Sequence, residues 1–294
     1  MKKFLEICQF SLVLFGLMIC GLFLTGLLST LPLGSSVGYA GQWVVFAGQN
    51  IFAFILPALL TWRICFKSRP LIAIEADRLP SLLTFVIAVV LYFVAIPALN
   101  QIIFWNQNMH LPQAFASFEN WCREMESLAE QQTSGLLNST DVFTFVMNLL
   151  IIAVLTGIGE EFFFRGALQR MLIHSSVNPH VAIWVSAFIF SALHFQFFGF
   201  IPRVLLGAWF GYLYWWCGSI WINSFAHALN NSLVIVSTWF INRGIMSDEL
   251  DMWGVTEGTF PFWPLASVMA FSILLCLTLR SKVIYKSRML PPEL

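Results

Sequence analysis

Long apolar stretches separated by short polar connections dominate the sequence. The hydrocarbon core of a bilayer takes about 20 helical residues to cross, and eight stretches have roughly that length. They cover residues 8–31, 43–63, 82–104, 143–165, 180–200, 201–217, 219–241 and 261–279. This pattern predicts an all-α fold, a polytopic membrane bundle of about eight transmembrane helices. The boundary between the fifth and sixth spans is the least marked, because only a very short turn at residues 199–202 separates them.

Basic residues indicate which ends of the spans face the cytoplasm, because cytoplasmic loops are enriched in Lys and Arg. With the N-terminus inside, 12 of the 15 basic residues fall in cytoplasmic segments. The outer segments then keep only Arg123, Arg203 and Arg243. An even number of spans with both termini cytoplasmic is therefore predicted.

One polar segment, at about 106–141, lies between the third and fourth spans. Its apolar residues recur at helical spacing, which predicts an amphipathic helix on the outer membrane interface. They are Phe115, Phe118, Trp121, Cys122, Met125 and Leu128. The chain thus divides into residues 1–142, with three spans and this extracytoplasmic segment, residues 143–241, with four spans, and residues 242–294. The last part holds a loop, the final span and a basic cytoplasmic tail.

Composition excludes a soluble protein and a nucleic-acid-binding protein. Hydrophobic residues make up 59% and charged residues 10%, and the mean hydropathy is +0.79. A soluble domain carries about 25% charged residues, so this chain is an integral membrane protein. Lys plus Arg equals Asp plus Glu, at 15 each, so no basic excess exists to bind nucleic acid. The six cysteines show no spacing typical of a metal site.

Ionisable residues inside a span are costly in lipid, so each is a candidate for function. The fourth span ends with Glu160, Glu161 and Arg165. Glu161 and Arg165 are four residues apart and can pair on one helix face, as structural support. Glu160 lies on another face without a local cation, which favours it as the reactive carboxylate. The alternative is that Glu160 shares Arg165.

Two later spans add further polar side chains. The fifth span contains His194, and a lone buried histidine is by itself more often a core residue than a catalytic one. The seventh carries a single polar stripe on an apolar helix. The stripe consists of Asn223, His227, Asn230 and Asn231. A glutamate, two histidines and an asparagine together can activate water and stabilise an oxyanion.

These residues also form three motifs in order, each in a predicted span: Glu160-Glu161-xxx-Arg165, Phe190-xxx-His194 and His227-xxx-Asn231. This pattern resembles that of the CPBP intramembrane proteases, the CAAX protease and bacteriocin-processing (Abi) family. The resemblance covers about residues 143–241, which it identifies as a CPBP-like catalytic core.

The resemblance implies that a water molecule deprotonated by Glu160, with help from His194, hydrolyses a peptide bond. His227 and Asn231 would then hold the oxyanion. A zinc-dependent version would use Glu160, His194 and His227 as ligands. The sequence lacks the HExxH motif, and an asparagine suits an oxyanion hole better than a metal site, so we expect no cofactor.

The expected substrate is a membrane-anchored protein or peptide in the lipid bilayer, and the expected location is the inner membrane of a bacterium. Two non-proteolytic alternatives remain. The polar stripe could only organise the bundle of a membrane scaffold or immunity protein. A transporter is disfavoured, because the ionisable residues cluster at one depth and do not line a path.

Overall fold

A computed structural model describes residues 2–30, 38–247, 253–257 and 261–280. This described part is helical, and it contains no strand. The elements follow in the order α1 (Lys2–Thr30), α2 (Tyr39–Gln49), η1 (Asn50–Ile55), α3 (Leu56–Phe66), α4 (Pro70–Ala73), α5 (Leu82–Gln107), η2 (Gln113–Phe115), α6 (Ala116–Leu137), α7 (Val142–Asn148), η3 (Leu149–Leu155), α8 (Thr156–Glu161), η4 (Phe162–Gln169), α9 (Arg170–His174), α10 (Pro179–Ala192), η5 (Phe197–Gly199), α11 (Phe200–Cys217), α12 (Ile220–Asn242) and α13 (Phe262–Arg280).

Six helical stretches are long and apolar enough to cross a membrane, among the residues described. They are Lys2–Thr30, Tyr39–Phe66, Leu82–Gln107, Val142–His174, Phe197–Cys217 and Phe262–Arg280. The two other predicted spans also correspond to helices. Helix α10 has only 14 residues, and α12 has 23 residues but carries the polar stripe. The protein is therefore a multi-pass integral membrane protein, while the count of eight spans and the side of each terminus stay predictions.

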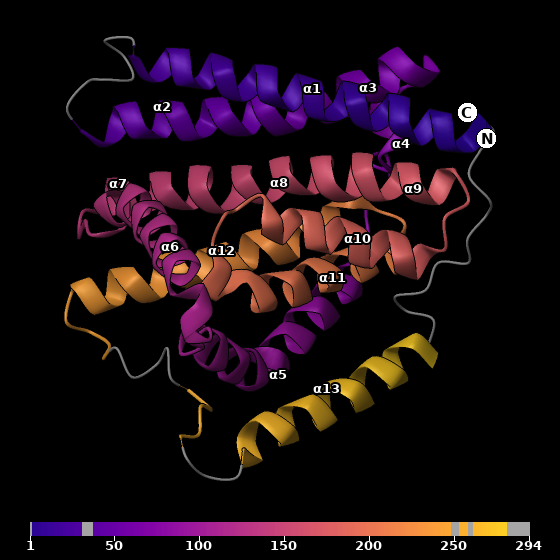
Figure 1. Ribbon diagram of the computed structural model, residues 1–294. Helices are drawn as coiled ribbons and strands as arrows, with labels where there is room; N and C mark the ends of the chain where they lie inside the picture. Colours follow the sequence, from indigo (N-terminus) through magenta and orange to yellow (C-terminus); the bar gives the residue numbers. More distant parts are fainter. Residues whose placement is uncertain (1, 31–37, 248–252, 258–260, 281–294) are drawn as a thin grey trace.

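The helices pack in layers around the continuous helix formed by α7, η3, α8, η4 and α9 (Figure 1). Helix α1 and the α2–α3 helix lie on one side of it, and α10, α11 and α12 lie on the other. Helix α13 packs against α5 at the edge of the bundle. Helix α6 runs across the direction of the other long helices (Figure 1). The predicted polar residues thus lie on helices at the centre of the bundle.

Local sequence signals explain where the central helices begin and end. Asn178 caps α10 by accepting a hydrogen bond from the His180 amide, and Pro179 follows at the first helical position. Ser219 caps α12 in the same way, through the amide of Trp221. Gly218 ends α11 with a φ of 60°, a left-handed conformation that glycine adopts without steric cost. These caps fix the register of the helices that carry the site.

The fifth predicted span is wrong in one respect, because residues 180–200 are not one continuous helix. Helix α10 ends at Ala192, and a turn at residues 193–196 follows. At about 1.5 Å per residue, α10 is about 21 Å long, less than the roughly 30 Å of a hydrocarbon core. Helix α10 alone is therefore shorter than a full span, and His194 lies in the turn and not in a helix.

The predicted amphipathic helix is present as α6. Cys122 and Leu136 are buried on its inner face, whereas Phe118 and Trp121 are exposed. Exposed aromatic side chains beside charged ones are typical of a helix at a membrane interface. The position of α6 at the outer interface stays a prediction.

Candidate active site

Glu161 is the centre of a fully buried polar network. Its Oε1 atom lies 2.7 Å from Nη1 of Arg165, and both side chains are 0% exposed. This is the pair that helical spacing predicts. Nδ2 of Asn223 donates to Oε2 of Glu161 at 2.6 Å, a contact that crosses from α12 to α8. Each charge is thereby compensated by a partner that is itself shielded from water.

Arg165 connects the network to a third helix. Its Nη2 atom donates to the carbonyl oxygen of Gly207, in α11, at 2.6 Å. The guanidinium also lies over the rings of Phe190 and Phe210, 4.8 and 5.6 Å from their centroids. Aromatic faces stabilise a cation that cannot reach water. The arginine is therefore held by α8, α10 and α11 together.

Glycines allow these helices to approach closely. A Cβ at Gly157 would lie 2.8 Å from the backbone nitrogen of Ala228, in α12, so only glycine permits this spacing of α8 and α12. At Gly207 a Cβ would lie 3.1 to 3.2 Å from Phe190, Ala187 and Arg165. Small residues commonly permit close helix packing in membranes. The approach at Gly157 brings the polar stripe of α12 to the two glutamates.

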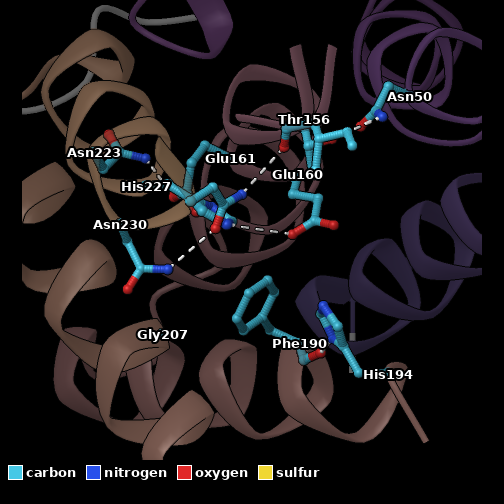
Figure 2. A network of polar contacts seen from close by, with 12 residues as sticks. Asn50, Thr156, Glu160, Glu161, Phe190, His194, Gly207, Asn223, His227 and Asn230 are labelled. Atoms are coloured by element: carbon cyan, nitrogen blue, oxygen red, sulfur yellow. Dashed lines mark hydrogen bonds and ion pairs between the residues drawn. The ribbon is translucent and has the colours of Figure 1, made fainter. Parts of the chain in front are cut away.

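His227 lies between the two glutamates. Its Nδ1 atom is 2.9 Å from Oε1 of Glu161, and a carboxylate can only accept, so Nδ1 carries a proton. Its Nε2 atom faces Oε2 of Glu160 at 3.7 Å (Figure 2). The ring stacks on Phe210, with centroids 4.9 Å apart and planes 17° apart. Glu161 and Phe210 together fix the imidazole so that Nε2 points toward Glu160.

Glu160 has few partners of its own. It is 8% exposed, and within the described part of the chain its carboxylate receives no hydrogen bond. The 3.7 Å to His227 is longer than a hydrogen bond. Its oxygen lone pairs are therefore available to a water molecule or a substrate, unlike those of Glu161.

His194 approaches this place from the turn after α10. Its Nδ1 atom donates to the carbonyl oxygen of Phe190 at 2.7 Å, because a carbonyl can only accept, and Nε2 is left for another partner. The Phe190 ring contacts both histidines, at centroid distances of 4.9 Å to His194 and 5.8 Å to His227. Glu160, His227 and His194 are turned toward a common space beside Phe190 (Figure 2).

The second half of the polar stripe, Asn230 and Asn231, forms a separate set of contacts. The hydroxyl of Tyr92 donates to Asn230 at 2.9 Å, and Nδ2 of Asn230 donates to Oδ1 of Asn231 at 3.1 Å. Nδ2 of Asn231 lies 3.4 Å from the carbonyl oxygen of Ile152, a long hydrogen bond. Its donor group is thus weakly engaged, and its predicted contact with an oxyanion stays a prediction.

Arg203 is a residue near the site that the sequence analysis assigned only to an outer loop. It lies in the first turn of α11, partly buried, and Nη2 donates to the side chain of Gln196 at 2.6 Å. The sequence does carry a signal for it, because Arg203 is an ionisable residue inside the sixth predicted span, 201–217.

The donor set for zinc is incomplete in this arrangement. Oε2 of Glu160 and Nε2 of His227 are close enough to share an ion, but zinc sites in enzymes use three protein ligands. Across the described residues, no three His, Cys, Asp or Glu side chains are grouped so that they could hold a metal. His194 does not complete the set as it is placed here.

Comparison with known proteins finds a family that the same segment resembles. Residues 142–233 match the family described as type II CAAX prenyl endopeptidase Rce1-like. Protein YpbD of Bacillus subtilis (strain 168), described as uncharacterized, is 28% identical over 86 residues. That alignment covers 28% of this chain and 41% of YpbD, so it spans about two fifths of the relative's length. No solved structure matches the chain. Residues 142–233 of this membrane protein, which contain Glu160, His194 and His227, are thus similar to this endopeptidase family, which is consistent with the resemblance to the CPBP proteases.

Proposed function

We propose that the protein is an intramembrane endopeptidase that hydrolyses a peptide bond in a membrane-associated protein or peptide. One observation carries the proposal: Glu160 is nearly buried, receives no hydrogen bond from the described residues and faces Nε2 of His227. A carboxylate shielded from bulk water but open to one bound molecule suits a general base. The Rce1-like match of residues 142–233 supports the same reaction class.

In this mechanism Glu160 accepts a proton from water while the water oxygen attacks the carbonyl carbon of the substrate. The free Nε2 of His194 can accept the second hydrogen of that water and orient it. The carbonyl oxygen becomes an oxyanion. When the C–N bond breaks, Glu160 returns its proton to the departing amine, so protons and charge balance.

His227 and Asn231 would stabilise the oxyanion. Glu161 accepts the Nδ1 proton of His227 and so orients the ring, and in this proposal Nε2 carries a proton when it donates to the oxyanion. The Nδ2 group of Asn231 would exchange its long contact with Ile152 for the oxyanion. Two such donors act on charge that develops only during the reaction.

Two alternatives make different predictions. In the zinc-dependent version of the hydrolysis, Glu160, His194 and His227 would have to converge on the ion. A non-catalytic scaffold or immunity protein accounts for the Glu161 network, but it gives no reason for a nearly buried Glu160 without a hydrogen bond. This carboxylate favours the catalytic proposal.

The proposed setting is the inner membrane of a bacterium, with eight spans and both termini cytoplasmic. The distribution of basic residues supports this topology, and the relative in Bacillus subtilis supports a bacterial membrane. A reporter fused after Ser287 should read cytoplasmic, and one inserted near Ser134 should read extracytoplasmic. The opposite result at either point would overturn the topology.

The decisive experiment compares cleavage of a membrane-anchored peptide by the purified protein and by Glu160→Gln in proteoliposomes. The substitution keeps the shape of the side chain but removes the base, so turnover should fall by about 10²–10⁴-fold while the fold persists. Glu124→Gln, at an exposed position in α6, is the matched control and should stay active. Full activity of Glu160→Gln would show that the base is another residue.

A further inference from the structure

The turn that carries His194 leaves polar backbone groups inside an apolar bundle. The first amides of α11 have no partner within their own helix, and a buried backbone group without a partner is costly in a membrane protein. Residues outside the Rce1-like match of 142–233 supply the missing partners. These residues belong to the end of α5 and to α6.

Asn106 and Glu126 bind the segment that directly follows the turn, in η5 and the start of α11. Oδ1 of Asn106 accepts from the amide of Ile201 at 2.9 Å, and its Nδ2 donates to the carbonyl of Phe197 at 3.3 Å. Oε2 of Glu126 accepts from the amide of Phe198 at 3.0 Å. We call Asn106 and Glu126 the outer clamp. It holds the chain three to seven residues after His194 with side chains from two other helices.

Aromatic contacts reinforce the clamp. The guanidinium of Arg123 lies 4.0 Å from the centroid of Phe198, and Phe198 is 4% exposed. Glu119 holds Arg123 in place through hydrogen bonds of 2.7 and 3.0 Å. Phe118 packs edge-on against Phe197. Helix α6 thus covers the turn from the side away from α10 and α11.

The turn adopts a conformation that requires such support. Phe195, the residue after His194, has a φ of 54°, in the left-handed region that bulky residues rarely adopt. Its side chain is 64% exposed, so packing of its own ring does not hold it there. Strained backbone persists where the surrounding structure determines it. The outer clamp supplies that constraint.

We propose that Glu126 and Asn106 are positioning residues that keep His194 aligned with Glu160. The amphipathic helix α6 is then part of the catalytic apparatus and not only a cover of the bundle. The role in catalysis rests on the proposed proteolysis. The effect on the turn itself does not, and it can be measured without any substrate.

The test compares Glu126→Ala, Glu126→Gln and Asn106→Ala with the wild-type protein in proteoliposomes. Glu126→Ala removes the acceptor, so hydrogen exchange of residues 193–201 should become faster. Turnover should fall by roughly 10- to 100-fold with KM nearly unchanged, because a small misplacement of a reacting group slows the chemical step. Glu126→Gln retains an oxygen that accepts from Phe198 and should restore most of both properties. Asn106→Ala should resemble Glu126→Ala.

Glu124→Ala is the control, since Glu124 is exposed on the same helix. The inference is overturned if Glu126→Ala leaves exchange at residues 193–201 unchanged, or if Glu124→Ala has the same effects. It is also overturned if exchange rises while turnover stays at the wild-type rate. If neither the wild-type protein nor Glu160→Gln cleaves the peptide, the proposed proteolysis fails. The exchange measurement still decides whether the clamp holds the turn.

Discussion

Glu160 and Glu161 are adjacent in the chain, but their carboxylates belong to two regions of the polar centre with different properties. In the closed region, Glu161 is bound by Arg165, Asn223 and His227, and it is completely buried. In the open region, Glu160 and Nε2 of His194 have no hydrogen-bond partner among the described residues. The two regions meet at His227, which touches both.

The difference shows how one sequence motif can serve two purposes. A buried charge is tolerated when partners surround it, and the closed region meets that condition. The open region does not, and polar groups left without partners are expected at places where a ligand or a reacting molecule supplies them. Stability should therefore depend on the first region and turnover on the second. Each prediction below tests that separation.

The largest effect is expected in the closed region, from Glu161→Gln. The change leaves Arg165 buried with a neutral partner, and breaking a buried ion pair costs about 3–5 kcal/mol in the free energy of unfolding. Thermal and denaturant unfolding in detergent would measure the loss. Glu160→Gln is the natural comparison, because it should change the same measurement little. Equal stability of the two variants would remove the distinction between the regions.

The sequence predicted most of the helices because apolar length decides what crosses a bilayer. Helix is present in each of the eight predicted stretches, although in the fifth it ends early at Ala192, and α6 lies within the predicted amphipathic segment. The early end of α10 was not predictable in this way. Residues 193–200 include Leu193, Phe195 and Phe200, so hydropathy continues without a break through the turn. The segment that follows the turn bonds to side chains from α5 and α6, which are distant in sequence.

Side-chain contacts were predictable only within one helix. The spacing of Glu161 and Arg165 sufficed for their pair, since both lie on consecutive helical turns. The contact of Glu161 with His227 joins residues 66 positions apart and depends on how α12 packs on α8. The sequence therefore predicts one partner of Glu161, whereas the structure shows three. The roles of Glu160, His194 and Asn231 in catalysis stay predictions.

A smaller effect is expected from Asn231→Ala, which tests whether Asn231 belongs to the open region. If its amide binds the oxyanion, turnover should fall by about 10²–10³-fold with little change in KM, since the interaction forms only in the transition state. Steady-state kinetics with the anchored peptide would measure both. Ser237→Ala is a control in the same helix, because among the described residues its hydroxyl bonds only to the backbone of Val234.

The opposite pattern for Asn231→Ala would also be informative. A rise in KM at constant turnover would place Asn231 in substrate binding and not in oxyanion stabilisation. A loss of stability with normal turnover would make it a structural residue that acts with Tyr92 and Asn230. Either result would show that Asn231 is not an oxyanion donor of the open region.

The smallest effect is expected from removal of metal, which tests what the open region binds. Glu160 and His227 are 3.7 Å apart, close to the roughly 3.4 Å between two ligands of one tetrahedral zinc ion, but a third ligand does not join them among the described residues. Prolonged dialysis against EDTA should therefore leave turnover almost unchanged, and active protein should contain far less than one zinc per chain. The control is a zinc peptidase treated in the same buffer, which should lose its activity. If this protein instead carried stoichiometric zinc whose removal abolished turnover and whose return restored it, the water activated by Glu160 alone would be the wrong mechanism. His194 and His227 would then be metal ligands, and the turn after α10 would have to move to bring His194 to the ion.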